Sequence, residues 1–365
     1  MSNEVWILGG TGRSARAIAA ELLRRGVEPV LVGRDEARLT AASPGGGRVV
    51  VAWDVAAMAA EIRGQRPAVV INTIGPFTVT AAPIIEACLP GTHYVDLAND
   101  VAAVGVVLDR HEAATAAGRT LVTGAGFGVT ATESVVVSLC EGRPQPSHVR
   151  VDMIPSLDLE AGRLGEALAG TMLEGLPGVE GGRRFGGRRY RSGRLAPAQL
   201  AGEPLDLTLP DGDTVTTASM PLGELIAAQR ASGAPSVLSA SSEAPSSPVI
   251  RAALPIATAL LYLAPLRAFA IRRLASVEFK ARKRPREFSW GHAVVRWPDG
   301  STAEGWLRVG EAQSFTGAVP AEVAKRLLAG EGKPGAHFPA ALFGPSLAES
   351  CGGEYVSAHS GHGRR

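Results

Sequence analysis

Glycines spaced for contact with a phosphate lie directly after the first apolar run of the chain. Val5 to Leu8 is apolar, and the pattern Gly9-x-x-Gly12-x-x-Ala15 follows it as a helical stretch begins. The first glycine permits a sharp turn, the second lets the backbone approach a pyrophosphate, and the small third residue lets the helix pack close to the sheet. Unpaired N–H groups of the first helical turn then face the phosphates. The spacing predicts a dinucleotide-binding turn.

The residue at the end of the second predicted strand indicates which dinucleotide binds. An NAD enzyme usually places Asp or Glu there to bond the ribose 2′-hydroxyl. Here the strand ends in Gly33-Arg34, and a planar guanidinium suits a 2′-phosphate, with help from Arg13 and Arg38. Asp35 comes one residue later and is expected to point away. We therefore expect NADP(H), the alternative being that Arg34 is a solvated loop charge.

Small and polar residues also follow three later strands, at the edge where open parallel sheets bind ligands. Asn72 to Phe77 follows the fourth strand, and Phe77 is expected either to wall the nicotinamide pocket or to pack in the core. Asp96 and Asn99 follow the fifth strand, and Asp96 is suited to bond a substrate amine, to relay a proton or to cap the next helix. Gly124 to Gly128 ends the sixth strand and indicates close approach to a ligand or a tight turn between domains.

These motifs define the candidate site residues. The cofactor candidates lie in the glycine turn and at the ends of later strands: Gly9, Thr11, Gly12, Arg13, Ser14, Arg34, Asp54, Asn72, Gly75, Pro76, Phe77, Gly126 and Phe127. Asp96 and Asn99 are the catalytic candidates, with water as the other source of a proton. No metal site is expected, because the histidines and the three cysteines lack ligand spacing.

The elements that must position these residues alternate between strand and helix over the first third of the chain. This alternation predicts βαβ units in a doubly wound parallel sheet, and continuous apolar strands indicate helices on both faces. Beyond about residue 128 the pattern predicts an α+β region with an antiparallel sheet. Its expected strands include 149–154, 292–297 and 302–309, and its expected helices include 162–176 and 320–329.

Composition is that of an ordinary globular protein. The chain has 365 residues, is 45% hydrophobic and 20% charged, and carries a formal net charge of +2. Its length suffices for two domains, and its charge gives no reason to expect nucleic acid. Three widely spaced cysteines fit a reducing compartment, and no signal peptide is recognised, so we expect a cytoplasmic protein.

One uncharged segment leaves two interpretations open. Residues 252–266 are fewer than the roughly 20 that a membrane span needs, and two prolines interrupt them. Arg267, Arg272 and Arg273 follow. The favoured interpretation is a buried or interface helix over 252–274, and the other is peripheral membrane contact through an apolar patch with a basic flank.

Motifs spread over nearly the whole chain form a specific combination. They are Gly9 to Gly12, Val32 to Arg34, Val70 to Phe77, Gly91 to Leu97, Gly124 to Gly128, Ala169 to Thr171, Ala231 to Pro235 and Phe338 to Pro345. The combination resembles the saccharopine dehydrogenase-like oxidoreductases, and the trans-acting enoyl reductases are similar too. Two positions depart from the family pattern: Ala15 replaces a frequent glycine, and Gly128 stands where many members have an acidic residue facing the nicotinamide pocket.

The resemblance implies a domain layout and an activity. A Rossmann domain is expected over 1–127, an α+β substrate and dimerisation domain over 128–330, a segment returning to the first domain over 331–356 and a disordered tail over 357–365. The implied activity is NADPH-dependent hydride transfer to a C=N or activated C=C bond of a small or lipid-like substrate, in a homodimer. The alternative is a non-catalytic NADP(H)-binding sensor or scaffold, which the missing Tyr-x-x-x-Lys pair of short-chain reductases favours.

Overall fold

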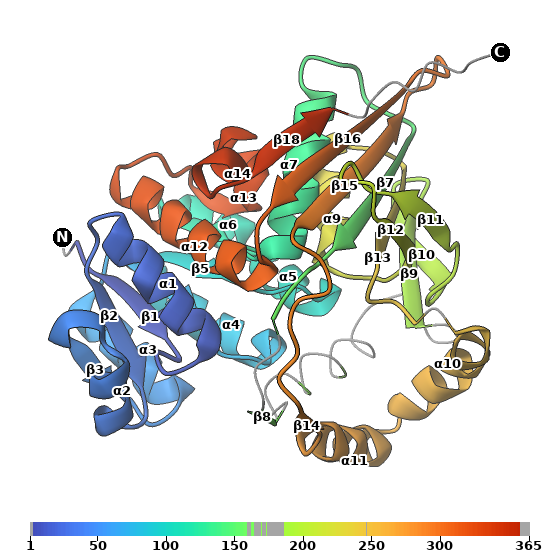
Figure 1. Ribbon diagram of the computed structural model, residues 1–365. Coiled ribbons are helices and arrows are strands. Elements are labelled where there is room, and N and C mark those ends of the chain that lie inside the picture. Colours follow the sequence, from blue (N-terminus) through green and yellow to red (C-terminus); the bar gives the residue numbers. More distant parts are fainter. Residues whose placement is uncertain are drawn as a thin grey trace.

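Two β-sheets with helices packed around and between them form the body of the protein (Figure 1). The computed structural model describes residues 3–158, 162–163, 169, 173, 186–245 and 247–357. Most of the helix expected at 162–176, and the tail from residue 358, lie outside the described residues.

The first sheet has seven parallel strands in the order β17-β6-β5-β4-β1-β2-β3. These strands are Val5–Leu8 (β1), Pro29–Gly33 (β2), Val49–Val51 (β3), Val69–Asn72 (β4), His93–Asp96 (β5), Thr120–Val122 (β6) and Gly335–His337 (β17). The strand order reverses beside β1, where β2 lies on one side and β4 on the other. This switch point, at the carboxyl ends of the strands, is where open α/β sheets bind ligands. The predicted doubly wound sheet is confirmed.

Helices cover both faces of this sheet. They are Arg13–Arg24 (α1), Glu36–Ala42 (α2), Val55–Gln65 (α3), Phe77–Cys88 (α4), Val101–Leu108 (α5), His111–Ala116 (α6) and Ala312–Leu328 (α12), with a short 3-10 turn at Pro44–Gly46. Alternate residues of β1 point to opposite faces. Ile7 therefore packs with Leu22 of α1, and Leu8 packs with Ile84 of α4. Burial on both faces explains why strands such as β1 and β2 are continuously apolar.

The second sheet has nine strands and is mixed. Its members are His148–Ile154 (β7), Gly186–Arg191 (β9), Arg194–Gln199 (β10), Leu205–Thr208 (β11), Thr214–Ser219 (β12), Ser236–Ser241 (β13), Ser289–Arg296 (β15), Thr302–Val309 (β16) and Glu354–Ser357 (β18). Most neighbours are antiparallel, as expected, but β13 runs parallel to β7. Phe127–Cys140 (α7) and Gly223–Ser232 (α9) pack on this sheet. Gly162–Arg163 (β8) and Glu278–Phe279 (β14) form a separate pair.

The last part of the chain links the two sheets. After β16, α12 packs along α1, β17 joins the edge of the first sheet beside β6, and β18 pairs with β16 of the second. Pro339–Phe343 (α13) and Ser346–Ser350 (α14) lie between β17 and β18. The buried Glu133 of α7 accepts hydrogen bonds from the backbone N–H groups of Ala340 and Ala341, at 2.9 and 2.8 Å. One carboxylate thereby holds the start of α13 against α7.

The uncharged segment forms two helices rather than one. Pro248–Leu261 (α10) and Ala264–Ala275 (α11) meet at an angle of 118°. Among the described residues no single helix is long and apolar enough to cross a membrane, although this bent pair meets the criteria of length and composition. The expectation of a buried helix is wrong, because Ile256 is 68% and Phe269 57% exposed. Short apolar runs usually belong to cores, but the packing of this one leaves a broad face uncovered.

Candidate functional site

The glycine turn joins β1 to α1 and leaves the first turn of α1 uncapped. Gly9 has φ +77°, and a Cβ there would lie 2.9 Å from Thr73 Oγ1, so only glycine fits without strain. The backbone N–H groups of Gly9 and Gly10 both donate to Val32 O at 3.0 Å. Gly12 precedes α1, no side chain caps the helix, and its first turn holds no acidic residue. This helix end is therefore open to an anion.

The end of β2 presents Arg34 rather than its acidic neighbour. Arg34 is exposed and forms no hydrogen bond or ion pair with any described residue. Asp35 instead caps α2, because its Oδ1 accepts from Arg38 N at 3.0 Å. Trp53, which is 73% exposed after β3, lines the same surface cavity as Arg34. Asp54 caps α3 through a 2.8 Å bond from Ala57 N. The Arg34 guanidinium and the Trp53 indole are therefore available to contact a ligand beside the edge of the sheet.

The loop after β4 is shaped by a buried amide. Asn72 Nδ2 donates to Thr80 Oγ1 and to the Tyr94 hydroxyl, both at 3.2 Å, and Asn72 Oδ1 accepts from Ile74 N at 3.0 Å. These bonds set the path of the backbone toward Gly75 and Pro76. Phe77 begins α4 and packs with the core cluster on that face of the sheet. Phe77 therefore packs in the core, which is one of the two positions expected for it.

Asp96 is fully buried at the carboxyl end of β5 and accepts four hydrogen bonds. The donors are the Tyr94 hydroxyl (2.9 Å), the Thr123 hydroxyl (2.8 Å) and the backbone N–H groups of Ala98 (3.1 Å) and Gly124 (3.2 Å). Burial raises the pKa of Asp96 to about 6, while these hydrogen bonds lower it. The bonds tie the end of β5 to the end of β6. The helix cap considered for Asp96 is made by Asp100, whose Oδ1 accepts from Ala103 N.

A cavity of about 340 Å³ lies between the first sheet and the second. Its walls come from the loop after β5, the start of α7, the end of β7 and the start of α12, and include Asn99, Gly126, Phe127, Gly128, Glu243 and Gln313. The Gln313 amide donates to Ser14 Oγ at 3.1 Å, which joins this wall to the first turn of α1. Thr316 Oγ1 accepts from Phe127 N at 3.1 Å. The cavity therefore adjoins the helix end expected to hold the phosphates.

A buried carboxyl group that the sequence did not single out lies behind this cavity. Glu224, near the start of α9, accepts a 3.2 Å bond from Asn99 Nδ2, and Asn99 Oδ1 accepts from Gly223 N. The other oxygen of Glu224 is buried and has no hydrogen-bond partner among the described residues. Burial raises the pKa of Glu224 to about 7, and Glu243 adds to the rise. No local motif marks Glu224, because only folding brings α9 to the loop after β5.

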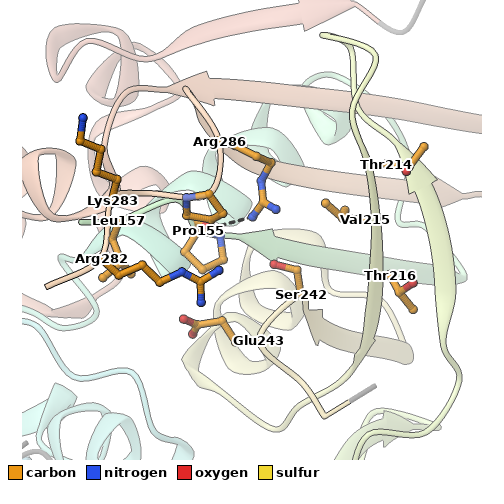
Figure 2. Close-up of a pocket in the computed structure, with 11 residues that line it drawn as sticks. Pro155, Leu157, Thr214, Val215, Thr216, Ser242, Glu243, Arg282, Lys283 and Arg286 are labelled. Atoms are coloured by element: carbon orange, nitrogen blue, oxygen red, sulfur yellow. Dashed lines mark hydrogen bonds between the residues drawn. The ribbon is translucent and has the colours of Figure 1, made fainter. Parts of the chain in front are cut away.

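A second cavity, of about 460 Å³, shares part of its lining with the first (Figure 2). Pro155, Leu157 and Glu243 line both cavities. Its other walls bring three basic side chains of one segment, Arg282, Lys283 and Arg286, opposite the strand that carries Thr214 to Thr216. Arg286 Nη2 donates to Pro155 O at 2.8 Å. Burial raises the pKa of Glu243. The second cavity therefore places three cationic side chains and one carboxyl group beside the first cavity.

The structure thus gathers the predicted residues into two groups. Gly9, Gly12, Arg13, Ser14 and Arg34 lie along the carboxyl edge of the first sheet, while Asn99, Gly126 and Phe127 line the cavity between the sheets. Asn72 and Asp96 lie beneath the site as buried supports, and Asp54 and Phe77 are engaged in a helix cap and in the core.

Comparisons with known proteins identify the fold. No protein-family model matches the sequence, and the search of curated proteins gives no match. Saccharopine dehydrogenase (L-Glu forming) from Saccharomyces cerevisiae is similar in structure, with a TM-score of 0.61 at 13% identity over 98% of this chain and 100% of that chain. A variant of meso-DAPDH from Clostridium tetani, solved with DAP, covers 93% of this chain and 96% of its own at 14% identity, with a TM-score of 0.43. The chain therefore has the fold of saccharopine dehydrogenase, as its motifs implied.

Proposed function

We propose that the protein is an NADP(H)-dependent oxidoreductase that reduces a C=N or an activated C=C bond. The observation that carries the cofactor assignment is the pair at the end of β2. Arg34 is exposed and unpaired among the described residues, while the carboxylate of Asp35 is occupied as the cap of α2. A guanidinium binds a 2′-phosphate through charge-assisted hydrogen bonds, whereas NAD binding calls for a free carboxylate at this place.

The turn between β1 and α1 supports binding of the pyrophosphate. Gly9 and Gly12 allow close approach of the backbone, and the first turn of α1 offers free N–H groups with no competing acidic side chain. Gln313 and Ser14 join this turn to the cavity between the sheets. The nicotinamide would supply a hydride when bound, and this cavity is the space where an acceptor would meet it.

The residues around the cavity support a proton transfer beside the hydride transfer. Glu243 lies on the wall and Glu224 lies behind Asn99, and burial raises the pKa of both carboxyl groups. Each carboxyl group therefore retains its proton to a higher pH than a glutamate with the ordinary pKa does. We assign Glu243 as the proton donor. The hydrogen-bonded pair of Asn99 and Glu224 positions the part of the cavity wall formed by the loop after β5. Asp96 supports the site by fixing the ends of β5 and β6.

The second cavity favours a substrate with an anionic group. Arg282, Lys283 and Arg286 line it, and Glu243 lies on the wall of both cavities. An acceptor bond in the first cavity would leave a carboxylate or phosphate of the same molecule within reach of these cations.

Titration of the protein with NADPH and NADH tests the cofactor assignment. Arg34→Ala should raise the Kd for NADPH about 10- to 100-fold, because hydrogen bonds to charged groups contribute about 1.5–3 kcal/mol, and should leave the Kd for NADH unchanged. Trp53→Ala is the matched control, since loss of an aromatic face should weaken both dinucleotides alike. Equal losses for the two dinucleotides in Arg34→Ala would contradict the 2′-phosphate assignment.

Turnover separates an enzyme from a binding protein. The protein with NADPH should reduce members of a panel of imines and enones, and Glu243→Gln should slow that reduction while leaving NADPH binding intact. Stoichiometric NADPH binding without turnover on any member would favour the sensor or scaffold. Turnover that is undiminished in Glu243→Gln would reject the role given to this carboxyl group.

A further inference from the structure

We propose that the hairpin formed by α10 and α11 docks on the surface of an anionic lipid bilayer. Its outward-facing side chains are apolar and broadly exposed: Val249, Ile250, Ile256, Leu260, Leu263, Leu266 and Phe269. Leu260 is 49% exposed, and Ile256 and Phe269 more so. These seven residues are most of the large exposed apolar side chains of the described chain. Such a concentration of exposed apolar side chains on two neighbouring helices indicates an interaction site.

Only one side of α10 contacts the second sheet. Leu254 on the inner side of α10 packs against a small cluster that contains Ala201, Ala218 and Ala244, and Thr258 is buried beside it. α11 packs mainly against α10, and Figure 1 shows the pair projecting at the lower edge of the molecule, away from the body of either sheet. One side of α10 is therefore anchored, which leaves the opposite side and α11 free to meet a flat surface.

The positive charge of the hairpin favours an anionic lipid surface as its binding partner. Residues 244–277 contain no aspartate or glutamate and carry Arg251, Arg267, Arg272 and Arg273; Glu278 and Lys280 follow. The whole chain has a net charge of only +2, so positive charge is concentrated here. Arg272 and Arg273 are exposed beside the apolar residues. Anionic headgroups complement this surface, whereas a second copy of the same surface would bring its arginines together.

The helix lengths indicate how the hairpin would lie. α10 has 14 residues and α11 has 12, so each is about 20 Å long, which is less than the roughly 30 Å of a hydrocarbon core. The 118° bend also prevents the two from forming one straight span. Helices of this length with apolar and basic residues lie in the interface, where the apolar side chains enter the acyl boundary and the arginines reach the headgroups.

Sedimentation of the full-length protein with lipid vesicles tests the proposal. Binding is expected to vesicles in which about one third of the phosphatidylcholine is replaced by phosphatidylglycerol, and it should weaken as salt is added. Ile256→Glu and Leu260→Glu should each reduce binding about tenfold or more, because the apolar burial of a large side chain is lost. The double variant Arg272→Gln/Arg273→Gln should bind about 25-fold more weakly, at about fivefold per charge near the surface.

Matched controls keep the result interpretable. Leu23→Glu places the same new charge at an apolar residue of α1 that is 37% exposed and distant in the fold, and it should bind vesicles like the natural chain. Thermal unfolding of each variant verifies that it folds. Absence of vesicle binding by the natural chain would overturn the proposal. So would a Leu260→Glu variant that keeps its vesicle binding but changes the oligomeric state, because the hairpin would then be an interface between copies.

Discussion

Replacement of Gly128 by alanine tests the packing behind the cavity between the two sheets. Gly128 lies in the first turn of α7, on the cavity wall. A Cβ at this position would lie well under 3.0 Å from Glu224 Oε1 and from Met153 Sδ, and 3.3 Å from Glu224 Cδ. The methionine end is flexible and can move. The Glu224 carboxylate is buried and bonded to Asn99, so it can yield only by breaking that bond.

Two destabilising contributions and one stabilising contribution determine how far Gly128→Ala changes the free energy of unfolding. Overpacking of a filled interior costs about 1–3 kcal/mol. Loss of the hydrogen bond between Asn99 and Glu224 adds about 1 kcal/mol. Alanine gains at most about 1 kcal/mol over glycine in a helix. We therefore expect Gly128→Ala to lower the free energy of unfolding by about 1–3 kcal/mol. Gly126→Ala is the matched control, since its Cβ would meet nothing nearer than Thr316 at 3.8 Å.

Urea unfolding of a double-mutant cycle measures this coupling. The cycle compares the natural chain with Gly128→Ala, Glu224→Ala and the double variant, with Gly126→Ala alongside. Once the Glu224 side chain is absent, only the flexible end of Met153 opposes the new methyl group, so Gly128→Ala should cost about 1–2 kcal/mol less in that background. An equal cost in both backgrounds would refute the stated contact. If Gly126→Ala lowers the free energy of unfolding as much as Gly128→Ala does, the contact of the new methyl group with Glu224 does not explain the loss.

Two further predictions concern the pH dependence of stability. Burial raises the pKa of Glu224 to about 7, so the stabilisation by its protonated form is complete below the ordinary value near 4.5 and is lost as pH rises through 7. Glu224→Gln mimics the protonated acid, so its free energy of unfolding should match that of the natural chain at about pH 4 and exceed it by about 3 kcal/mol at about pH 8.5. Urea midpoints that stay parallel across this range would contradict the shift. Burial lowers the pKa of His292, but hydrogen bonds with Asp152 (2.9 Å) and Glu304 (3.1 Å) and their charges raise it overall. Its contribution is therefore complete below pH 6.5 and is lost as pH rises through the folded value, so His292→Phe should cost about 3 kcal/mol at pH 6 and less at pH 9; a cost that grows with pH in thermal unfolding would reject the protonated histidine.

The first sheet was predictable because its signals are local. Val5–Leu8 is a continuous apolar run, and the glycine spacing after it predicts the turn in which Gly9 has φ +77°. The hairpin of β11 and β12 was likewise predictable from the turn residues Asp211 and Gly212. The parallel pairing of β13 with β7 was not, because strand direction within a mixed sheet depends on partners distant in the chain.

Tertiary contacts also decided what several candidate residues do. Asp35, Asp54 and Asp96 have the same carboxylate, yet the first two cap helices and the third accepts four bonds in the interior. Sequence position alone cannot distinguish these outcomes, since each depends on which donors folding brings within about 3 Å. Glu224 could not be recognised from the sequence for the same reason, because its hydrogen-bond partner Asn99 lies 125 positions away in the chain.

Residue types and their spacing by themselves determined the doubly wound sheet, the glycine turn after β1 and the cationic end of β2, because each depends on neighbours within a few residues. Only the tertiary structure decided that the cavity between the sheets is walled by Gly128, Glu243 and Gln313, from three separate parts of the chain. It also decided that the apolar segment after Pro248 projects outward rather than filling a core. Burial depends on what packs against a segment, and an apolar run has the same composition whether or not anything covers it.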